Sequence, residues 1–436
     1  MGHMVNTDRE YRLLQQRLDS TVTGAPYSPT FMQILKLLFR PEEARLANKL
    51  PLKLQPLSSI SGKLGLPPEE LGEKITDMAR RGLVIDMELN DKRYVILAPV
   101  VIGFFEYTFM RTRDELPMKE LSKLFDTYMK EEKEFAHSVF QGQTQIGRAL
   151  VREEALPEED FSEILDWERA SSFIEQATDI GVSLCACRHH HSHLGNACER
   201  PQRTCLSFNY GAIPMINAGL AERISVQEAL KILQECKELG LAQVGDNVKR
   251  RPVYMCNCCG CCCGMMQAIR TFNIKNAIVT SNWIMHTDPE VCKGCGKCAK
   301  ACPVDAIELK TEMRGQKKKA WAVLDESLCL GCGVCYSACK HGAIAMRPRA
   351  KRVYTPETVF DKTVAMAIER GKISTLLFDN PEKFSHRALA RMVGLIEKSP
   401  PYKAAMAIAP LRSVFLNALV KGAKTTTGSS RKSLGG

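Results

Sequence analysis

The sequence predicts a multidomain α+β protein, and three observations lead to this fold class. The chain has 436 residues, more than a single compact domain usually contains. Residues 29–99 combine helical and strand-like apolar patterns, as a small helical domain with a hairpin does. Most of the 19 cysteines lie in two short segments, 185–205 and 256–263, and in a repeated pattern at 292–339. Separate cysteine-rich units are therefore expected after the first domain.

Composition indicates the cellular setting. No apolar run reaches the roughly 18 residues that a membrane-spanning helix needs, and the polar N-terminal region has no signal-peptide core. Residues 1–4 resemble a cloning remnant and are set aside. Many cysteines in a large chain of this kind indicate metal binding in a reducing compartment rather than disulfides. We expect a cytoplasmic protein of an anaerobe, because so many metal–sulfur sites would be sensitive to oxygen.

Residues 29–99 contain helical patterns followed by a hairpin. The expected helices are 31–39, 42–50, 57–66 and 69–81, and the expected strands are 83–87 and 94–97. Gly82 is placed to end the last helix, and Asn90-Asp91-Lys92 to form the turn. This order resembles winged-helix domains of the bacterial regulator type.

The last of these helices argues against DNA binding. It begins with Glu69 and Glu70, and Glu73 and Asp77 follow. A helix that enters the major groove must instead neutralise phosphates and offer hydrogen-bond donors to bases. We therefore expect this domain to dock a partner protein or to form a homodimer, and we do not expect it to bind DNA.

Eight cysteines between 292 and 339 have the spacing of ligands to cubane iron–sulfur clusters. Two runs of Cys-x2-Cys-x2-Cys-x3-Cys begin at Cys292 and Cys329. In the bacterial run, three cysteines surround one cluster and the fourth ligates the other cluster. The expected ligand sets are Cys292, Cys295, Cys298 with Cys339, and Cys329, Cys332, Cys335 with Cys302. Zinc sites usually contain two cysteine pairs, so this spacing favours two [4Fe–4S] clusters over zinc or disulfides.

The repeat extends beyond its cysteines. Ala306-Ile307 follows Cys302 as Ala343-Ile344 follows Cys339, and glycines separate the ligands where the loops must turn tightly. These glycines are Gly294, Gly296, Gly331 and Gly333. The region resembles two-[4Fe–4S] ferredoxins, which implies a βαβ unit followed by its pseudo-copy. Lys340 stands where that family usually has proline, at a position that is not a ligand.

The cysteines between 185 and 263 are too many to serve only as core residues. The first cysteine segment contains Cys185, Cys187, Cys198 and Cys205, and the second contains Cys256, Cys258, Cys259, Cys261, Cys262 and Cys263. Each follows an apolar, strand-like stretch, so we expect the two segments to meet at one sheet edge. Thiols in this number favour metal ligands. The spacing allows one cluster for each segment or a larger, fused cluster with ligands from both. Cys236, alone in an expected helix, is interpreted as a small core residue.

Four histidines and an arginine lie beside the first cysteine segment. His189, His190, His191 and His193 follow Arg188. One of them can ligate a metal or deliver protons. We favour the interpretation that they are exposed, or that they donate hydrogen bonds to cluster sulfurs. Arg188 is expected to balance the negative charge of a cluster.

Residues 165–347 as a whole resemble ferredoxin-like iron–sulfur proteins of anaerobes. The matching residues are Cys185, Cys187, Arg188, Cys198, Pro201, Cys205 to Phe208, and Cys256 to Gly264. In that group, two cysteine-rich motifs precede a two-cluster ferredoxin module. The resemblance implies electron transfer without a particular substrate. It also implies that most of the ten central cysteines hold one or two further iron–sulfur clusters of unknown type.

The C-terminal quarter is basic. The net charge of the chain is +11, and the excess of Lys and Arg lies within residues 311–436. Lys317 to Lys319 are expected in a linker between the two ferredoxin halves. Helices are expected at 356–370, 385–397 and 404–419, before a disordered end at 422–436. We favour the docking of an acidic redox partner, because opposite charge speeds encounters. The alternatives are peripheral membrane contact and a solvated helical tail that packs on its own domain.

The expected domains follow from these patterns. They are a tag and N-terminal tail (1–28), a winged helix (29–116), a helical linker with a cysteine-rich α/β domain (117–288), a two-cluster ferredoxin domain (289–347) and a basic helical extension with a disordered end (348–436). The expected function is the relay of single electrons between redox partners in anaerobic metabolism.

Two other functions stay open at this point. One is an oxidoreductase that reduces a small molecule at the central cysteine-rich cluster. The other is a redox-sensing winged-helix transcription factor. The sequence has no dinucleotide fingerprint, phosphate-binding loop or nucleophile elbow. It does not decide whether flavin is bound.

Overall fold

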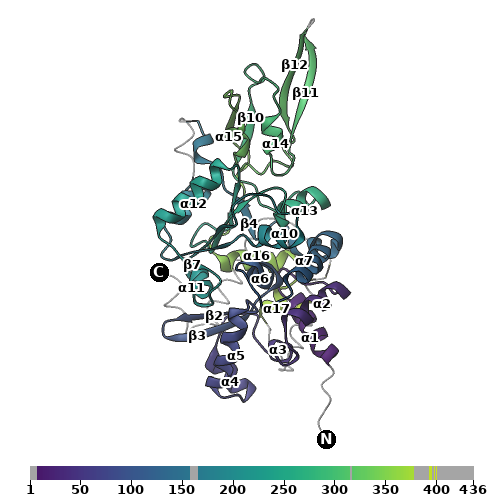
Figure 1. Ribbon diagram of the computed structural model, residues 1–436, viewed down its shortest axis with the longest axis vertical. Coiled ribbons are helices and arrows are strands. Elements are labelled where there is room, and N and C mark those ends of the chain that lie inside the picture. Colours follow the sequence, from purple (N-terminus) through teal and green to yellow (C-terminus); the bar gives the residue numbers. More distant parts are fainter. Residues whose placement is uncertain are drawn as a thin grey trace. The chain divides into compact units, whose positions relative to one another are not determined.

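The computed structural model describes residues 7–157, 165–314 and 317–377, together with 392–394, 397 and 399. Helices and strands both occur along these ranges (Figure 1), which is the mixed content that the sequence predicts. The chain divides into two compact units. The first contains the described residues within 1–104, 141–144 and 360–436, and the second contains those within 105–140 and 145–359. No helix of the described part is long and apolar enough to cross a bilayer.

Helices and a three-stranded sheet form the N-terminal part of the first unit. They are α2 (Pro29–Leu38), α3 (Pro41–Ala47), β1 (Gln55–Pro56), α4 (Leu57–Leu64), α5 (Pro68–Arg80), β2 (Val84–Leu89) and β3 (Lys92–Leu97), with strand order β1-β3-β2. Phe31, Leu35 and Leu38 on α2 are buried at helical spacing, as are Leu71 and Ile75 on α5. The helices and the hairpin therefore occur in the order expected from the sequence.

Residues 7–19, expected as part of an N-terminal tail, form helix α1 (Thr7–Asp19). Tyr11, Leu14 and Leu18 are buried on it, and the helix contacts α2 and α3. The expectation of a tail is wrong, because residues spaced three and four apart form one apolar stripe on a helix. The helix is not evident from the sequence because charged and amide side chains lie between these three residues.

Two C-terminal helices belong to the same unit, namely α16 (Val359–Glu369) and α17 (Ile373–Leu377). Val364, Ala367, Ile368 and Ile373 form a small buried core. The Arg370 guanidinium donates hydrogen bonds to the carbonyls of Val22 (3.1 Å) and Thr144 (3.4 Å). The helix expected at 356–370 is thus present. The helix expected at 385–397 lies largely outside the described residues, and the segments at 404–419 and 422–436 lie entirely outside them.

The second unit is built around a six-stranded sheet of order β4-β8-β9-β6-β5-β7. The strands are β4 (Gly147–Ala149), β5 (Ile180–Leu184), β6 (Arg203–Phe208), β7 (Glu222–Arg223), β8 (Ala242–Asp246) and β9 (Tyr254–Cys258). The helices are α6 (Phe105–Phe109), α7 (Met118–Asp126), α8 (Lys133–Phe140), α9 (Ala170–Glu175), α10 (Ala186–Leu194), α11 (Asn209–Asn217), α12 (Val226–Glu238) and α13 (Gly264–Phe272). Cys236 on α12 lies in the hydrophobic core with Ala229 and Leu233, which confirms its interpretation as a core residue.

The topology brings the two cysteine segments to one edge of this sheet. Strands β5 and β9 both pair antiparallel with β6, so they run in the same direction. The first cysteine segment begins where β5 ends, and the second occupies the end of β9 and the residues after it. Cys205 lies near the start of β6, opposite Ser183 near the end of β5. The strand directions therefore explain why the two segments meet.

Residues 283–348 form two small antiparallel sheets with two short helices. The elements are β10 (Trp283–Thr287), α14 (Lys297–Ala301), β11 (Ile307–Arg314), β12 (Lys317–Leu324), α15 (Val334–Ala338) and β13 (Ile344–Pro348). Strand β10 pairs with β13, and β11 pairs with β12 as a long hairpin (Figure 1). We had expected Lys317 to Lys319 in a linker between the two ferredoxin halves. They lie instead in strand β12. The register of this hairpin runs from the pair Ile307 and Leu324 to the pair Arg314 and Lys317.

Candidate functional site

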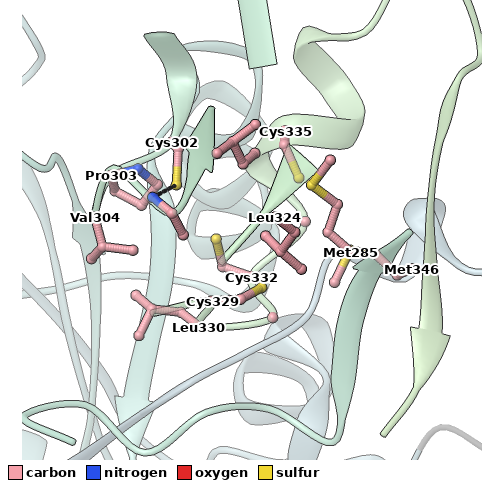
Figure 2. Close-up of a pocket in the computed structure, with 14 residues that line it drawn as sticks. Met285, Cys302, Pro303, Val304, Leu324, Cys329, Leu330, Cys332, Cys335 and Met346 are labelled. Atoms are coloured by element: carbon pink, nitrogen blue, oxygen red, sulfur yellow. Dashed lines mark hydrogen bonds between the residues drawn. The ribbon is translucent and has the colours of Figure 1, made fainter. Parts of the chain in front are cut away.

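Two pockets in the 283–348 region are each lined by four cysteines. The inner pocket is lined by Cys302, Cys329, Cys332 and Cys335 (Figure 2). The outer pocket is lined by Cys292, Cys295, Cys298 and Cys339. Each pocket contains three cysteines of one run and the fourth cysteine of the other run. The structure thus brings together the same two sets that the spacing grouped.

Short helices explain this crossed arrangement. Cys298 lies on α14 and Cys302 follows directly after its end, while Cys335 lies on α15 and Cys339 follows it. The two helices contact each other, so the fourth cysteine of each run reaches the pocket of the other run. The loops before the helices turn at Gly294, Gly296, Gly331 and Gly333, whose φ angles of 64°, 74°, 72° and 78° suit glycine. At Gly331 a Cβ atom would also clash with Trp283 O.

The inner pocket fits an iron–sulfur cluster and does not suit free thiolates. Met285, Leu324 and Leu330 help to line it, so its walls are mostly apolar. Burial raises the pKa of Cys332 to about 12, although the backbone N–H of Val334 acts in the opposite direction. A thiolate in such surroundings needs a cation close to it, and metal ligation provides one. The Ala306 N–H donates to Cys302 Sγ (3.3 Å, Figure 2), a kind of hydrogen bond that tunes cluster potentials.

The outer pocket has the same cysteine arrangement in more polar surroundings. Cys295 is exposed, and Lys293, Lys297 and His341 contribute to the lining. Lys300 lies two residues after Cys298 and Lys340 directly follows Cys339, and both are exposed. The outer pocket is therefore the more accessible of the two, and exposed lysines lie beside its cysteines.

Four of the central cysteines form a compact set that we call the Cys198 group, namely Cys198, Cys259, Cys261 and Cys262. The Cys198 sulfur lies 3.6 Å from that of Cys259 and 4.0 Å from that of Cys262. The sulfurs of Cys261 and Cys262 are 3.8 Å apart. All four lie within 4.8 Å of one another. A hydrogen bond from Cys262 lowers the pKa of Cys259, which favours the thiolate that a metal needs.

Five further cysteines form the Cys256 group, namely Cys187, Cys205, Cys256, Cys258 and Cys263. Hydrogen bonds join Cys256 to Cys205 and Cys258, and Cys263 to Cys187 and Cys258. These bonds lower the pKa values of Cys256 and Cys263 well below the ordinary range. Cys256 and Cys258 are two residues apart in β9 and so lie on the same face, whereas the Cys198 group uses residues beyond the strand. Both groups therefore combine the two cysteine segments, and neither segment forms a site of its own.

Arg188 lies fully buried next to both groups. Its guanidinium donates to the carbonyls of Pro201 (2.9 Å) and Asn257 (3.0 Å), and to Thr204 Oγ1. Nη1 is 3.9 Å from Cys259 Sγ. Burial acts to lower the pKa of Arg188, but the thiols of Cys185 and Cys259 outweigh this effect and the pKa is raised. Arg188 thus lies where a charge partner for anionic sulfur was expected.

Three of the four histidines of α10 do not have the surroundings that we expected. His189, His190 and His191 are buried, and their ring nitrogens contact the carbonyls of Phe109 (2.8 Å), Ser122 (2.8 Å) and Cys187 (2.7 Å). These contacts replace the exposure or the bonds to sulfur that the sequence favoured. The reason is that α10 packs against α6 and α7, with the His190 ring 5.1 Å from that of Phe109.

A lysine occupies the polar space beside two of these histidines. Asp126 has a carboxylate oxygen within 4.8 Å of ring nitrogens of His190 and His191. The Lys130 ammonium pairs with Asp126 and lies 2.9 Å from His191 Nε2. Because Lys130 already provides the positive charge there, we interpret this cluster as a buried polar network that holds α7 against α10.

His190 should make the stability of the fold depend on pH. Burial lowers its pKa from 6.5 to about 4, with Asp126, Lys130 and His191 as its charged or titratable neighbours. Below pH 6.5 the unfolded chain binds a proton that the folded chain does not, so the free energy of unfolding should fall as pH is lowered towards 4. We expect a loss of about 1 kcal/mol between pH 7.5 and 5.5. Denaturant unfolding at the two pH values measures it, and His190→Asn should show a smaller difference. An equal difference in the variant would contradict this assignment.

Direct contacts join the inner pocket to the central cysteines within the second unit. A Cβ atom on Gly260 would clash with Pro303 O and lie 2.9 Å from Pro303 Cα, so the second cysteine segment touches the residue after Cys302. The Arg152 N–H donates to Cys332 O (3.3 Å), and the Arg349 guanidinium donates to Cys329 O (2.7 Å). Sequence reasoning missed Arg152, because one arginine after a short strand has no distinctive pattern.

Comparison with known proteins identifies one part of the chain. Residues 291–343 match the family model of the 4Fe-4S dicluster domain. This match and the two four-cysteine pockets support iron–sulfur clusters in the protein, and with them electron transfer in general. No curated protein and no solved structure gives a significant match.

Proposed function

We propose that the protein relays single electrons between redox partners in anaerobic metabolism through several iron–sulfur clusters. The main support is the pair of four-cysteine pockets within the stretch that matches a dicluster domain. A [4Fe–4S] cluster in each pocket would supply one-electron chemistry. The task of the chain is to hold the ligands, exclude water from the inner pocket and set potentials through burial and N–H···S bonds. In this proposal residues 289–347 are a ferredoxin-type pseudo-repeat.

The surroundings of the two pockets suggest an order for the relay. The outer pocket is more accessible, and the inner pocket lies beside the second cysteine segment through the contact between Gly260 and Pro303. We propose that electrons pass between a partner and the outer cluster, then the inner cluster, and then the central cysteine-rich site.

The same surroundings suggest the chemistry of the redox partner. Lys293, Lys297, Lys300 and Lys340 are exposed near the outer pocket. We propose that a partner with an acidic surface docks there, because opposite charges raise the encounter rate and orient the complex. The salt dependence of electron transfer to such a partner tests this proposal.

The N-terminal part of the first unit supports docking of a protein rather than of DNA. We propose that residues 29–99 form a winged helix that contacts a partner or a second copy of the chain. Glu69 and Glu70 lie in the first turn of α5, and Arg81 at its end is paired with Glu43 and Asp77 (3.1 Å to Asp77). The helix therefore has little free positive charge for phosphates.

Metal analysis of protein purified without oxygen tests the proposed function. We expect at least about eight iron atoms and a similar amount of acid-labile sulfide for each chain, because two cubane clusters contain that number. Dithionite should bleach the brown colour, and the reduced protein should show EPR signals of two interacting [4Fe–4S]⁺ clusters. A colourless protein without sulfide would end this proposal.

Replacement of Gly260 should disturb the path between the inner pocket and the central cysteines. In Gly260→Ala the new methyl group meets the Pro303 backbone, which cannot move as a flexible side chain does. We expect a loss of about 1–3 kcal/mol in the free energy of unfolding. We also expect slower electron transfer from the reduced clusters to the central site, measured by freeze-quench EPR, with unchanged iron in the two pockets.

Gly264→Ala, four residues later at the first residue of α13, is the matched control. Its nearest contact would be Met129 Cε at 3.3 Å, the end of a flexible side chain. This variant should keep both the stability and the transfer rate of the wild type. Equal effects of the two substitutions would show that the contact between Gly260 and Pro303 has no special part in the relay.

A further inference from the structure

We propose that the Cys198 group holds a single divalent metal ion in a closed tetrahedral site, Zn²⁺ or Fe²⁺, and not an iron–sulfur cluster. The ligands are Cys198, Cys259, Cys261 and Cys262. Whether this site exists does not depend on the direction or the partners of the electron relay. The proposal differs from our expectation that the central cysteines hold one or two further iron–sulfur clusters.

The distances between sulfur atoms support one ion. Four thiolates bound to one zinc ion at about 2.3 Å form a tetrahedron whose edges are about 3.8 Å long. Three sulfur–sulfur distances in the Cys198 group are 3.6, 3.8 and 4.0 Å. All four sulfurs lie within 4.8 Å of one another. The sulfurs are thus close enough together to bind one metal ion, and too close to surround a cubane cluster.

The inner and outer pockets provide a comparison within the same chain. In a cubane cluster each thiolate binds a different iron at a separate corner, so the ligand sulfurs surround the cluster. Each of these pockets is lined by four cysteines. Among the described residues, the Cys198 group is the one set of cysteines whose sulfurs all lie within 4.8 Å of one another. Its spacing therefore differs from that of the cysteines in the dicluster match.

Charge and hydrogen bonds support the same site. Four thiolates around a divalent ion have a net charge of −2, which must be balanced where the site is buried. Arg188 Nη1 lies 3.9 Å from Cys259 Sγ, and within the described residues no carboxylate forms an ion pair with Arg188. The backbone N–H groups of Cys262 and Cys198 donate to the sulfurs of Cys259 and Cys262. Cys261 is exposed, so water can solvate the remaining charge.

A site with four protein ligands has no open position, which is the arrangement of structural metal sites. Here it would connect Cys198, in the loop between α10 and β6, to the residues that follow β9. Gly260, which contacts Pro303 beside the inner pocket, lies between two of the ligands. We infer that the ion holds this loop in the conformation that the inner pocket contacts. The Cys256 group remains available for the central redox site.

Metal analysis of the full chain, purified without oxygen, tests the single-ion site. The readouts are zinc and iron content, and X-ray absorption at the edge of the bound metal. Wild-type protein should contain one ion for each chain with four sulfur neighbours at about 2.3 Å. Cys261→Ser changes the most exposed ligand and should lose this ion or replace one sulfur neighbour by oxygen, with the cluster iron unchanged. Cys198→Ser should have the same effect. The test therefore remains possible if one of the two variants does not fold.

Cys236→Ser is the control, because Cys236 lies in the core of α12 outside both groups. It should keep both the ion and the cluster iron. Loss of one zinc in the ligand variants supports Zn²⁺, and loss of one iron with a rubredoxin-type spectrum supports Fe²⁺. A loss of about four iron atoms together with a cubane EPR signal would overturn the proposal. Unchanged metal content and coordination in both ligand variants would also overturn it. A protein that contains this ion but no clusters would contradict the proposed electron relay and would still support the single-ion site.

Discussion

Cys302→Ser should damage the cluster of the inner pocket and leave that of the outer pocket intact. This is the largest effect that we expect, because the pocket would lose one of four ligands to a redox cofactor. The result runs against the order of the chain, since Cys302 belongs to the same run as Cys292, Cys295 and Cys298. In the structure, however, Cys302 lines the pocket of Cys329, Cys332 and Cys335. Anaerobic iron content and EPR of the reduced protein measure the loss, which is up to about four iron atoms.

A double-variant comparison assigns the affected cluster. In protein that already lacks the inner cluster through Cys332→Ser, addition of Cys302→Ser should cause little further loss of iron. In protein that lacks the outer cluster through Cys295→Ser, the same addition should remove the cluster that is left. Cys339→Ser should show the reverse pattern, because Cys339 lines the outer pocket. The opposite pattern would mean that each run binds its own cluster.

Arg188→Met should destabilise the second unit by about 3–5 kcal/mol, which is the usual cost of removing one partner of a buried charge pair. The substitution leaves the anionic sulfurs of the central groups without their buried cation. It also leaves the carbonyls of Pro201 and Asn257 without the donor that they share. Denaturant unfolding of anaerobic protein measures the loss, and we expect weaker metal retention in the central groups.

Two further variants separate charge from a general effect of losing an arginine. Arg188→Lys keeps the charge but not the planar group of donors, so it should recover part of the stability. Arg203→Met removes an arginine of the same sheet whose ion pairs with Glu222 (2.8 Å) and Glu228 (2.9 Å) are exposed. It should cost no more than about 1 kcal/mol. A similar loss for Arg188→Met and Arg203→Met would contradict the role that we assign to Arg188.

Local sequence patterns predicted where helices and strands occur better than they predicted which elements pack or pair with one another. The helices at α2 and α5 and the strands β5 and β9 follow from apolar periodicity. Periodicity did not reveal α1, whose apolar stripe is separated by charged residues, or strand β12, which begins with lysines. In both cases an apolar partner surface or a paired strand decides the structure. Such partners are not visible in a local window.

The histidines show the same limit at the level of a site. Next to Cys187, a run of histidines is typical of metal ligands or proton carriers. The packing of α10 against α6 and α7 instead turns His189 and His190 towards the carbonyls of Phe109 and Ser122. Which face of α10 is covered depends on helices more than 60 residues earlier in the chain.

The sequence by itself determined the two four-cysteine sets of residues 292–339. Ligands three residues apart can surround one cluster, so the local spacing of the cysteines is enough to predict the ligand sets. Only the tertiary structure decided how nine of the ten central cysteines, all except Cys185, divide into two groups. The parallel directions of β5 and β9 bring two distant segments to one edge, and the end of β9 then separates Cys256 and Cys258 from Cys259, Cys261 and Cys262. That division depends on strand pairing across the sheet. The positions of neighbouring cysteines in the sequence do not reveal this pairing.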